Sequence, residues 1–245
     1  MDDEGNGSPF AVVKVIRPSL LGGDSVGEDH RARVRFAREI DAVRAVVSHR
    51  TPRLFAAEAE AEQPWMAMEY VPGPTLGAMV SRAGTFSVAP YAALGLAVAE
   101  ALRAIHDMGL LHRDLKPGNV VLGPAGPVVL DFGIAVLAER QARQAVTRTG
   151  TTLGTAAYMP LEQAEDAKHV DRSADVYSLG ATLFFAATGR PPYSVAPLPT
   201  ESVWDGVDPE FRPLLARMLV QISERRPSLD EVEQSLLTLL NRNRT

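Results

Sequence analysis

Three polar residues, Asp114, Asn119 and Asp131, flank a short stretch of β-prone sequence. Asp114 and Asn119 precede one apolar run, residues 120–122, and Asp131 follows a second, residues 128–130. Gly-Pro-Ala-Gly-Pro separates the runs, so we expect a β-hairpin that brings the three polar side chains to one edge. Carboxylate and amide oxygens suit Mg²⁺, and a second carboxylate can take a proton from an attacking hydroxyl. The stretch therefore predicts phosphoryl transfer from a nucleoside triphosphate.

The sequence around these residues resembles a known family. HRDLKPGN, which ends at Asn119, and DFG, which starts at Asp131, resemble the catalytic and magnesium-binding loops of eukaryotic-type serine/threonine protein kinases of the bacterial kind. Any one of these residues alone is more often a turn or cap residue. The resemblance implies that Asp114 orients and deprotonates the substrate hydroxyl, that Lys116 steadies the γ-phosphate, and that Asn119 and Asp131 hold the metal ions. It implies ATP and Mg²⁺ as cofactors, with Mn²⁺ able to replace Mg²⁺.

A lysine and a glutamate upstream fit the same interpretation. Residues 10–16 form a strand-like run with one cation, Lys14, and residues 28–47 carry apolar side chains at helical spacing around Glu39. Taken alone, Lys14 is more often an exposed strand residue, and Glu39 is more often a partner of Arg35 at i, i+4. The resemblance of Ala-Val-Val-Lys to a kinase strand implies instead that Lys14 contacts the α- and β-phosphates and pairs with Glu39.

The adenine site is expected where the strand-like run of residues 64–70 meets Pro-Gly-Pro. By the resemblance, Met68 is the gatekeeper, a position that equally suits a core-filling methionine. The resemblance also implies that the backbone of Glu69 and Val71 binds adenine and that Val121 contacts the nucleotide. Val12 occupies the family's alanine position and is expected to crowd the base.

A long segment with little apolar periodicity runs from Asp131 to Glu162, and loops of this length are usually functional or mobile. Thr147 and Thr149 have a T-x-T spacing that resembles the autophosphorylated loop of bacterial receptor-like kinases. Arg113 is the cation expected to bind the added phosphate. Thr155, together with Lys116, resembles the serine/threonine-specific pattern. The alternative, that these threonines belong to a plain solvated loop, stays open.

Three more charged residues are expected to be structural. Glu162 stands in Pro-Leu-Glu, which resembles the family's A-P-E motif, and the resemblance pairs it with Arg226. Asp175 lies near the start of SADVYSLGATLFFAATG, which is apolar on nearly every side and predicts a buried helix. Asp175 is either a capping charge at that helix or, by the resemblance, the residue that holds the backbone of the catalytic loop.

The predicted fold class is α+β, with a protein-kinase-like arrangement of two lobes. Residues 1–71 are expected to form a partial N-terminal lobe with a small sheet and one helix, residues 72–240 a larger, mainly helical C-terminal lobe, and residues 241–245 a frayed tail. In the larger lobe, helices are predicted from Ser87 to Met108, from Asp208 onward, and from a capping box at residues 228–231 to about Leu240.

The composition excludes several classes of protein. The chain has 245 residues, 46% of them hydrophobic, with a formal net charge of −5, which favours a folded domain over a disordered chain or a nucleic-acid-binding surface. It has no cysteine, which fits the cytoplasm, and we expect no membrane-spanning run and no signal peptide. The expected partners are ATP and protein substrates, whereas the oligomeric state is not indicated.

Two pieces of the family pattern are missing. No G-x-G-x-x-G sequence precedes Lys14, because Gly5-Asn6-Gly7 lies too close to it for a returning strand. Residues 193–204 are too short and too rich in proline for the family's substrate-docking helix. We therefore expect either a natural chain that begins further upstream or a degraded relative. The alternative functions are an impaired pseudokinase that acts as a binding or regulatory module and, more remotely, a small-molecule kinase.

Overall fold

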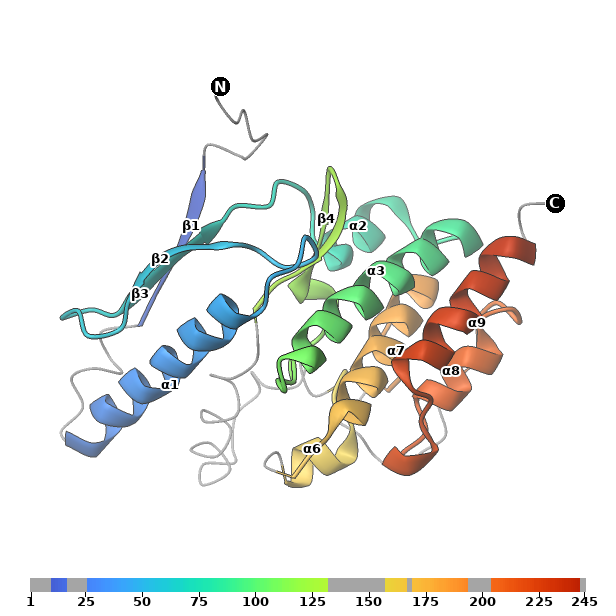
Figure 1. The fold of residues 1–245 in the computed structure, drawn as a ribbon. Helices are drawn as coiled ribbons and strands as arrows, with labels where there is room; N and C mark the ends of the chain where they lie inside the picture. Colours follow the sequence, from blue (N-terminus) through green and yellow to red (C-terminus); the bar gives the residue numbers. More distant parts are fainter. Residues whose placement is uncertain (1–9, 17–25, 132–156, 167–168, 194–203, 243–245) are drawn as a thin grey trace.

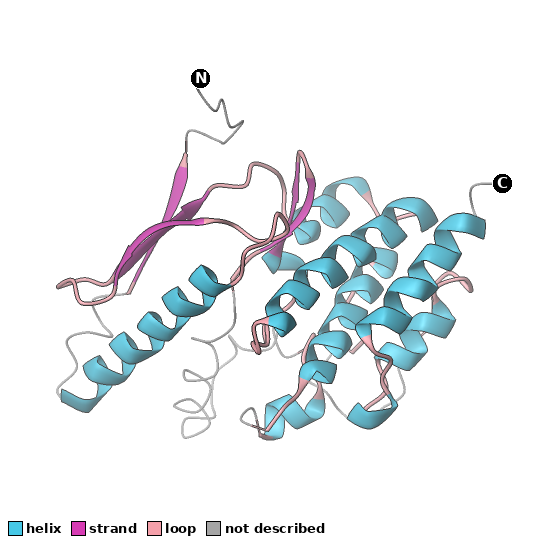
Figure 2. Cartoon of the chain, in the orientation of Figure 1, coloured by secondary structure: helices cyan, strands magenta, loops and turns pink. Residues whose placement is uncertain are grey.

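The computed structural model describes residues 10–16, 26–131, 157–166, 169–193 and 204–242. Within these residues the chain forms a lobe with a three-stranded sheet and one long helix, beside a larger helical lobe (Figure 1). Figure 2 shows this sheet at one end of the molecule and most helices at the other. The predicted α+β, two-lobed fold class is confirmed.

The sheet of the smaller lobe is antiparallel, with strands β1 (Ala11–Val15), β2 (Leu54–Glu58) and β3 (Trp65–Glu69) in the order β1-β3-β2. Helix α1 (Val26–Ala45) covers one face of it. Side chains alternate between the two faces of a strand, so every second residue of β3 can face this helix. Met66 does so and packs with Ile16, Phe36 and Ile40 in a small separate core.

The larger lobe is built around two apolar helices, α3 (Val88–Asp107) and α7 (Arg172–Thr188). Helix α7 is buried on nearly every side, as its uniformly apolar sequence predicts. Around this pair lie α2 (Leu76–Ala83), α8 (Arg212–Met218), α9 (Leu229–Arg242) and the short α6 (Leu161–Glu165). The hairpin of β4 (Val120–Gly123) and β5 (Gly126–Val129) lies beside this lobe and is present as predicted.

Helix α3 bears on the expectation that the chain has no membrane-spanning run. By length and composition alone it is long and apolar enough to cross a membrane. Most of its apolar side chains are buried, and it packs against α7 and α9 as the central helix of the core. A core helix that contacts other helices on most sides needs the same apolar composition as a spanning helix.

Several predicted helix ends differ in detail. Ser87 is the N-cap of α3, but its side chain makes no capping hydrogen bond. Helix α8 begins at Arg212 and not at Asp208, because the Asp208 carboxylate accepts the N–H of Glu210 at 2.9 Å and forms a turn. The predicted capping box before α9 is present, and that helix runs to Arg242, past the predicted end.

Two segments join the lobes through backbone contacts, in addition to the packing of Val43 and Val46 into the larger core. The segment between β3 and α2 carries Gly73 at φ 146°, where a Cβ would lie 2.3 Å from the carbonyl oxygen of Leu122, so only glycine fits. The loop between α1 and β2 carries Arg50, whose Nε donates to Glu100 of α3 at 2.8 Å. The carbonyl of Arg50 also accepts the N–H of Val129 at 2.8 Å, which fixes the end of α1 to the larger lobe.

Candidate functional site

The hairpin places the two polar loops side by side. A short 3₁₀ turn, η2 (Pro117–Asn119), leads into β4, and Asp131 follows β5 after Leu130. The N–H of Leu130 donates to the carbonyl of Asn119 at 2.8 Å, which ties the start of one strand to the end of the other. The backbone therefore brings Asn119 close to Asp131, as the turn sequence predicts.

Asp114 is held by two neighbours in its own loop. Its Oδ2 atom accepts from Lys116 Nζ at 2.7 Å and from Asn119 Nδ2 at 3.0 Å, and Asn119 Nδ2 also donates to the Asp114 carbonyl at 2.8 Å. The residue is 8% exposed, so bulk water contributes little to its solvation. A buried carboxylate with fixed orientation and a cation beside it is suited to accept a proton from a hydroxyl.

Asp175 of α7 holds the backbone of the loop that carries Asp114. It is fully buried in α7, and its carboxylate accepts the N–H of His112 at 2.9 Å and that of Arg113 at 2.8 Å, while His106 Nε2 lies 2.8 Å away. Burial works against its charge, but the hydrogen bonds, chiefly that from His106, lower the pKa of Asp175 below its ordinary value. Asp175 is therefore an anion that binds the backbone beside Asp114.

Two site residues have a left-handed backbone. Arg113 at φ 63° and Asp131 at φ 50° are the non-glycine residues with positive φ in the described part of the chain. Such conformations cost roughly 1–3 kcal/mol each and persist where the surroundings enforce them. For Arg113, the enforcing contacts are its N–H to Asp175 and its carbonyl, which accepts from Gln163 Nε2 of α6 at 2.6 Å.

Sequence reasoning missed three polar residues that support the loop, namely His106, His112 and Gln163. His112 links the two polar loops, since its Nε2 lies 3.0 Å from the Leu130 carbonyl and its Nδ1 accepts the N–H of Asp114 at 3.2 Å. Complete burial lowers the pKa of His112, so it is neutral with its proton on Nε2. The signal available in the sequence was position: His106 and His112 lie shortly before or within His-Arg-Asp, and Gln163 directly follows Pro-Leu-Glu.

The smaller lobe contributes an ion pair to the same region. Lys14 of β1 pairs with Glu39 of α1, and its Nζ lies 3.3 Å from Asp131 Oδ1. Burial opposes the charge on Lys14, but the two carboxylates outweigh it and raise its pKa. Burial raises the pKa of Glu39, and the ammonium of Lys14 counteracts that effect. Among the described residues, Glu39 therefore pairs with Lys14 of the sheet and not with Arg35 of its own helix.

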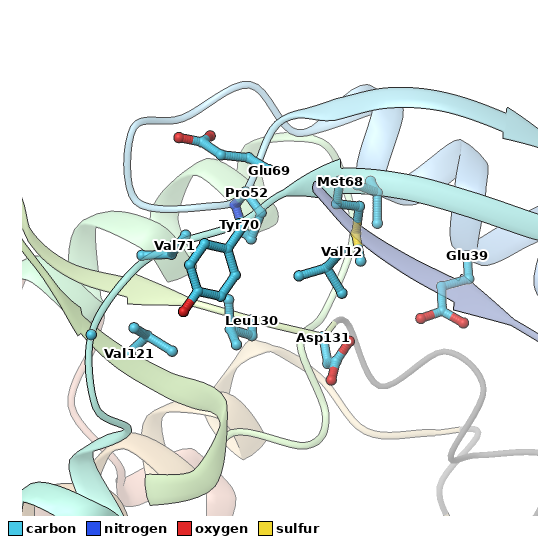
Figure 3. A pocket seen from close by; sticks show the side chains of 12 residues that line it. Val12, Glu39, Pro52, Met68, Glu69, Tyr70, Val71, Val121, Leu130 and Asp131 are labelled. Atoms are coloured by element: carbon cyan, nitrogen blue, oxygen red, sulfur yellow. The ribbon is translucent and has the colours of Figure 1, made fainter. Parts of the chain in front are cut away.

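A cavity of ≈ 240 Å³ lies between the lobes beside this ion pair. Five of the six predicted nucleotide-binding residues line it, all except Lys14. Figure 3 shows Val12 and Met68 on the sheet side, with Val121 and Leu130 on the hairpin side. Asp131 and Glu39 lie toward one end. The lining residues are Val12, Glu39, Val43, Pro52, Met68, Glu69, Tyr70, Val71, Gly73, Val121, Leu130 and Asp131. This apolar slot with charges at one end suits a flat base attached to a polyphosphate.

The oxygen donors near the cavity fit a divalent cation that is shared with a phosphate ligand. The Asp131 side chain is half-exposed, and Asn119 uses its amide nitrogen toward Asp114, which leaves its amide oxygen for another ligand. No cluster of three or more His, Cys, Asp or Glu residues that could hold a metal ion by itself occurs in the described part of the chain. A hard cation such as Mg²⁺ commonly takes one or two protein oxygens and completes its shell with phosphates and water.

The predicted structural pair is present in the larger lobe. Arg226 is fully buried at its side chain and contacts Glu162 through both terminal guanidinium nitrogens, with Nη2 3.1 Å from Oε2. Its guanidinium also lies 5.0 Å from the ring centre of Tyr177. The pair fixes α6 beside α7 and so holds Gln163 against the catalytic loop.

For four residues, Thr147, Thr149, Thr155 and Arg113, the structure does not show the predicted contact. Thr147, Thr149 and Thr155 lie outside the described residues, as do the two residues after Asp131 in DFG. Arg113 is described, and its guanidinium makes no ion pair with the described residues, although its Nε is buried. Its pKa is lowered by burial, yet arginine stays protonated at neutral pH.

Comparison with known proteins supplies the context for this geometry. A family model described as the protein kinase domain matches residues 24–238. The serine/threonine-protein kinase AfsK of Streptomyces coelicolor is 39% identical over 233 residues, which cover 91% of this chain and 28% of AfsK. The probable serine/threonine-protein kinase PkwA of Thermomonospora curvata is 37% identical, covering 86% of this chain and 30% of PkwA.

A third relative is the serine/threonine-protein kinase PknB of Mycobacterium tuberculosis, 34% identical over 238 residues, covering 87% of this chain and 36% of PknB. The chain thus spans roughly a quarter to a third of the length of the curated relatives it matches. The matched region includes the catalytic loop, the hairpin and α7, which carry the polar cluster described above.

Proposed function

The chain belongs to the protein kinase family, and from this premise we propose that it transfers the γ-phosphoryl group of ATP to serine or threonine hydroxyls of proteins. The observation that carries the proposal is the buried Asp114, fixed by Lys116 and Asn119 in a loop that the hairpin brings near Asp131, which lines the cavity and contacts Lys14. The names of the relatives support serine/threonine specificity.

In the proposed reaction, Asp114 accepts the proton of the substrate hydroxyl while the hydroxyl oxygen bonds to the γ-phosphorus. The bond from that phosphorus to the β,γ-bridging oxygen breaks, and ADP leaves with the electron pair. Lys116 stays close to the transferring group, and Lys14, oriented by Glu39, binds the α- and β-phosphates. Asn119 and Asp131 would hold a divalent cation, Mg²⁺ or Mn²⁺, which neutralises phosphate charge when bound.

Regulation by autophosphorylation is part of the same proposal. Thr147 and Thr149 are the proposed acceptors, and Thr155 the residue that favours a serine or threonine substrate. The guanidinium of Arg113, which makes no ion pair with the described residues, supports a phosphate partner, because a phosphorylated threonine brings a charge of about −1.5 to −2 at pH 7. We also propose that the protein acts in the cytoplasm, where ATP is available.

Nucleotide binding is tested by thermal unfolding with and without ATP and Mg²⁺. At about 100 times Kd, ligand binding stabilises by about 2.7 kcal/mol, which raises Tm by roughly 5–10 °C for a domain of this size. We expect Asp131→Ala to abolish this shift, because it removes the half-exposed carboxylate at the phosphate end of the cavity. Asp107→Ala, a change at an exposed residue at the end of α3, should keep the full shift. A full shift in Asp131→Ala would contradict the proposed metal and nucleotide site.

A binding or regulatory module with impaired catalysis is the second candidate. It is favoured by the lack of a G-x-G-x-x-G sequence in the 245 residues, since such a loop normally covers the phosphates. Under both candidates ATP raises the Tm of the chain. Only a kinase also transfers phosphate to itself or to an added protein substrate.

The side chain of Val12 is expected to limit ATP affinity. The cavity of ≈ 240 Å³ is smaller than the roughly 300–1,000 Å³ of ordinary ligand pockets. Val12 lines it, and in the sheet Val12 faces Met68 of the neighbouring strand β3. Val12→Ala enlarges the cavity without removing a polar group. We expect KM for ATP to fall roughly 10-fold with kcat unchanged, the effect of about one methylene in an apolar pocket. Val13→Ala, on the other face of the same strand, is the matched control for steady-state kinetics.

A further inference from the structure

Gln163 is a buried polar residue that the proposed reaction does not use. It is 4% exposed and lies on α6, which Figure 1 shows at the same end of the larger lobe as the start of α7. Its Nε2 donates to the carbonyl of Arg113 at 2.6 Å, whereas its Oε1 is buried without a hydrogen-bond partner among the described residues. A buried oxygen without a partner costs stability, so stability alone does not favour glutamine over an apolar side chain of the same length.

The contact of Gln163 fixes the peptide unit that joins Arg113 to Asp114. Gln163 holds the carbonyl of this unit, and the N–H of the unit, which belongs to Asp114, donates to the carbonyl of His112 at 2.9 Å. The preceding unit is held as well, because the N–H of Arg113 donates to Asp175 at 2.8 Å. The backbone on the two sides of Arg113 is therefore held by side chains from two different helices, α6 and α7.

Arg113 needs this support because its backbone is left-handed. At φ 63° the Cβ atom of an L-residue crowds the following carbonyl oxygen, a conformation that few residue types other than glycine adopt readily. Without the contact to Gln163, the backbone of Arg113 can relax toward negative φ. Such a change turns the peptide unit that leads into Asp114, and it moves the Asp114 carboxylate relative to Lys116 and Asn119.

The position of Gln163 depends on a contact outside the catalytic loop. Its neighbour Glu162 is bound by the buried Arg226, which also donates to the carbonyl of Ser173 at 3.3 Å, at the start of α7. Helix α6 is thus fixed to the same helix that carries Asp175. The two side chains that hold the backbone of the catalytic loop therefore belong to one connected support.

We propose that Gln163 is a positioning residue for phosphoryl transfer: its side-chain amide holds Arg113 in the left-handed conformation and thereby keeps Asp114 oriented to accept the proton of the substrate hydroxyl. The effect on rate rests on the proposed kinase function. The hold on the loop is a property of the fold, so it is measurable even in a chain that transfers no phosphate. Because Gln163 acts through the backbone of the catalytic loop, it affects the chemical step and not the affinity for ATP.

Gln163→Met tests this role, since methionine has a similar length but no hydrogen-bond donor. We expect kcat to fall roughly 5- to 30-fold, the factor by which a left-handed backbone is disfavoured, with KM for ATP unchanged. Amide hydrogen exchange of Arg113 and Asp114 should become faster by a similar factor. Tm should stay nearly constant, because the change removes the oxygen without a partner together with the hydrogen bond.

The matched control is Gln221→Met, the same change at a partly buried glutamine whose Nε2 contacts the hydroxyl of Tyr193 at 3.4 Å. It should leave kcat and the exchange of both loop amides unaltered. Unaltered exchange of these amides in Gln163→Met overturns the proposal, whether or not the chain transfers phosphate. Faster exchange with unaltered kcat in an active chain also overturns it. If the unchanged chain transfers no phosphate, the proposed kinase function fails, and the exchange rates alone decide the role of Gln163.

Two variants of Arg113 separate a hold on the backbone from a plain packing role of Gln163. Arg113→Ala and Arg113→Gly both remove the guanidinium, but only glycine adopts positive φ without a penalty. We expect Gln163→Met to speed exchange of the Asp114 amide roughly 5- to 30-fold in the alanine background. In the glycine background the effect should be only about 2-fold, because glycine populates positive and negative φ about equally. Equal effects in the two backgrounds would show that Gln163 only packs α6, which refutes the proposal.

Discussion

Asp114→Asn is expected to reduce the rate of phosphoryl transfer by roughly 10²- to 10⁴-fold, the usual contribution of a general base. Asparagine keeps the shape of the side chain and can still contact Lys116, but it cannot take the proton of the attacking hydroxyl. The buried position of Asp114 also excludes a water molecule as an efficient substitute. Phosphate incorporation into a protein substrate, measured with ATP and Mg²⁺ at saturation, gives the ratio of the two rates.

The control for this variant separates chemistry from binding. The Tm shift produced by ATP with Mg²⁺ should be nearly the same in Asp114→Asn as in the unchanged chain, because Lys14 and Asp131 are intact. Asp107→Asn, the same chemical change at an exposed residue of the same lobe, should leave the rate unaltered. If Asp114→Asn transfers phosphate at the original rate, Asp114 is not the base.

Asp175→Ala is expected to lower the free energy of unfolding by roughly 3–5 kcal/mol, the usual effect of removing one partner from a buried charged contact. The change leaves the N–H groups of His112 and Arg113 without their acceptor in a fully buried place. It also removes the contact that holds Arg113 in its left-handed conformation. Urea unfolding of the two proteins at pH 7 measures the difference, and a loss below about 1 kcal/mol would contradict the assigned role.

The same carboxylate predicts how stability depends on pH. The pKa of Asp175 is lowered in the folded state, so the unfolded chain takes up the proton first as pH falls. Its stabilising contribution is therefore complete above the unfolded pKa of about 3.9 and is lost as pH falls through the lower folded value. Asp175→Asn removes this titration, so its stability should fall less than that of the unchanged chain over this acid range. A parallel loss in both proteins would assign the acid sensitivity to other carboxylates.

Local sequence patterns predicted most of the elements of the fold. Alternating and helical spacing predicted β1, α1 and α3, and the proline- and glycine-rich turn predicted the hairpin before Asp131, because these features depend on neighbours in the chain. Helix α2 was missed, although Thr75 caps it through a hydrogen bond to Ala78. Its eight residues carry too few apolar positions to stand out beside the lobe connection.

The contacts within the site were less predictable from the sequence than the elements of the fold. The pair of Lys14 and Glu39 joins residues that are 25 positions apart, so spacing alone left Arg35 as an equally acceptable partner, and only the family resemblance favoured the observed one. The support from His106 and Gln163 could not be derived, because a buried histidine or glutamine acquires its partner from tertiary packing. The roles of Thr147, Thr149 and Thr155 stay predictions.

The two contacts between the lobes have a mechanical consequence. Gly73 on one side and Arg50 on the other tie the smaller lobe to the larger one near the ends of β3 and α1, while the rest of the sheet lies beyond both ties. The ion pair of Lys14 with Asp131, at 3.3 Å, is a third link between the lobes and lies away from the other two. A rotation of the smaller lobe about Gly73 and Arg50 would therefore change the distance between Lys14 and Asp131, so the position of the lobe and the state of the site are coupled.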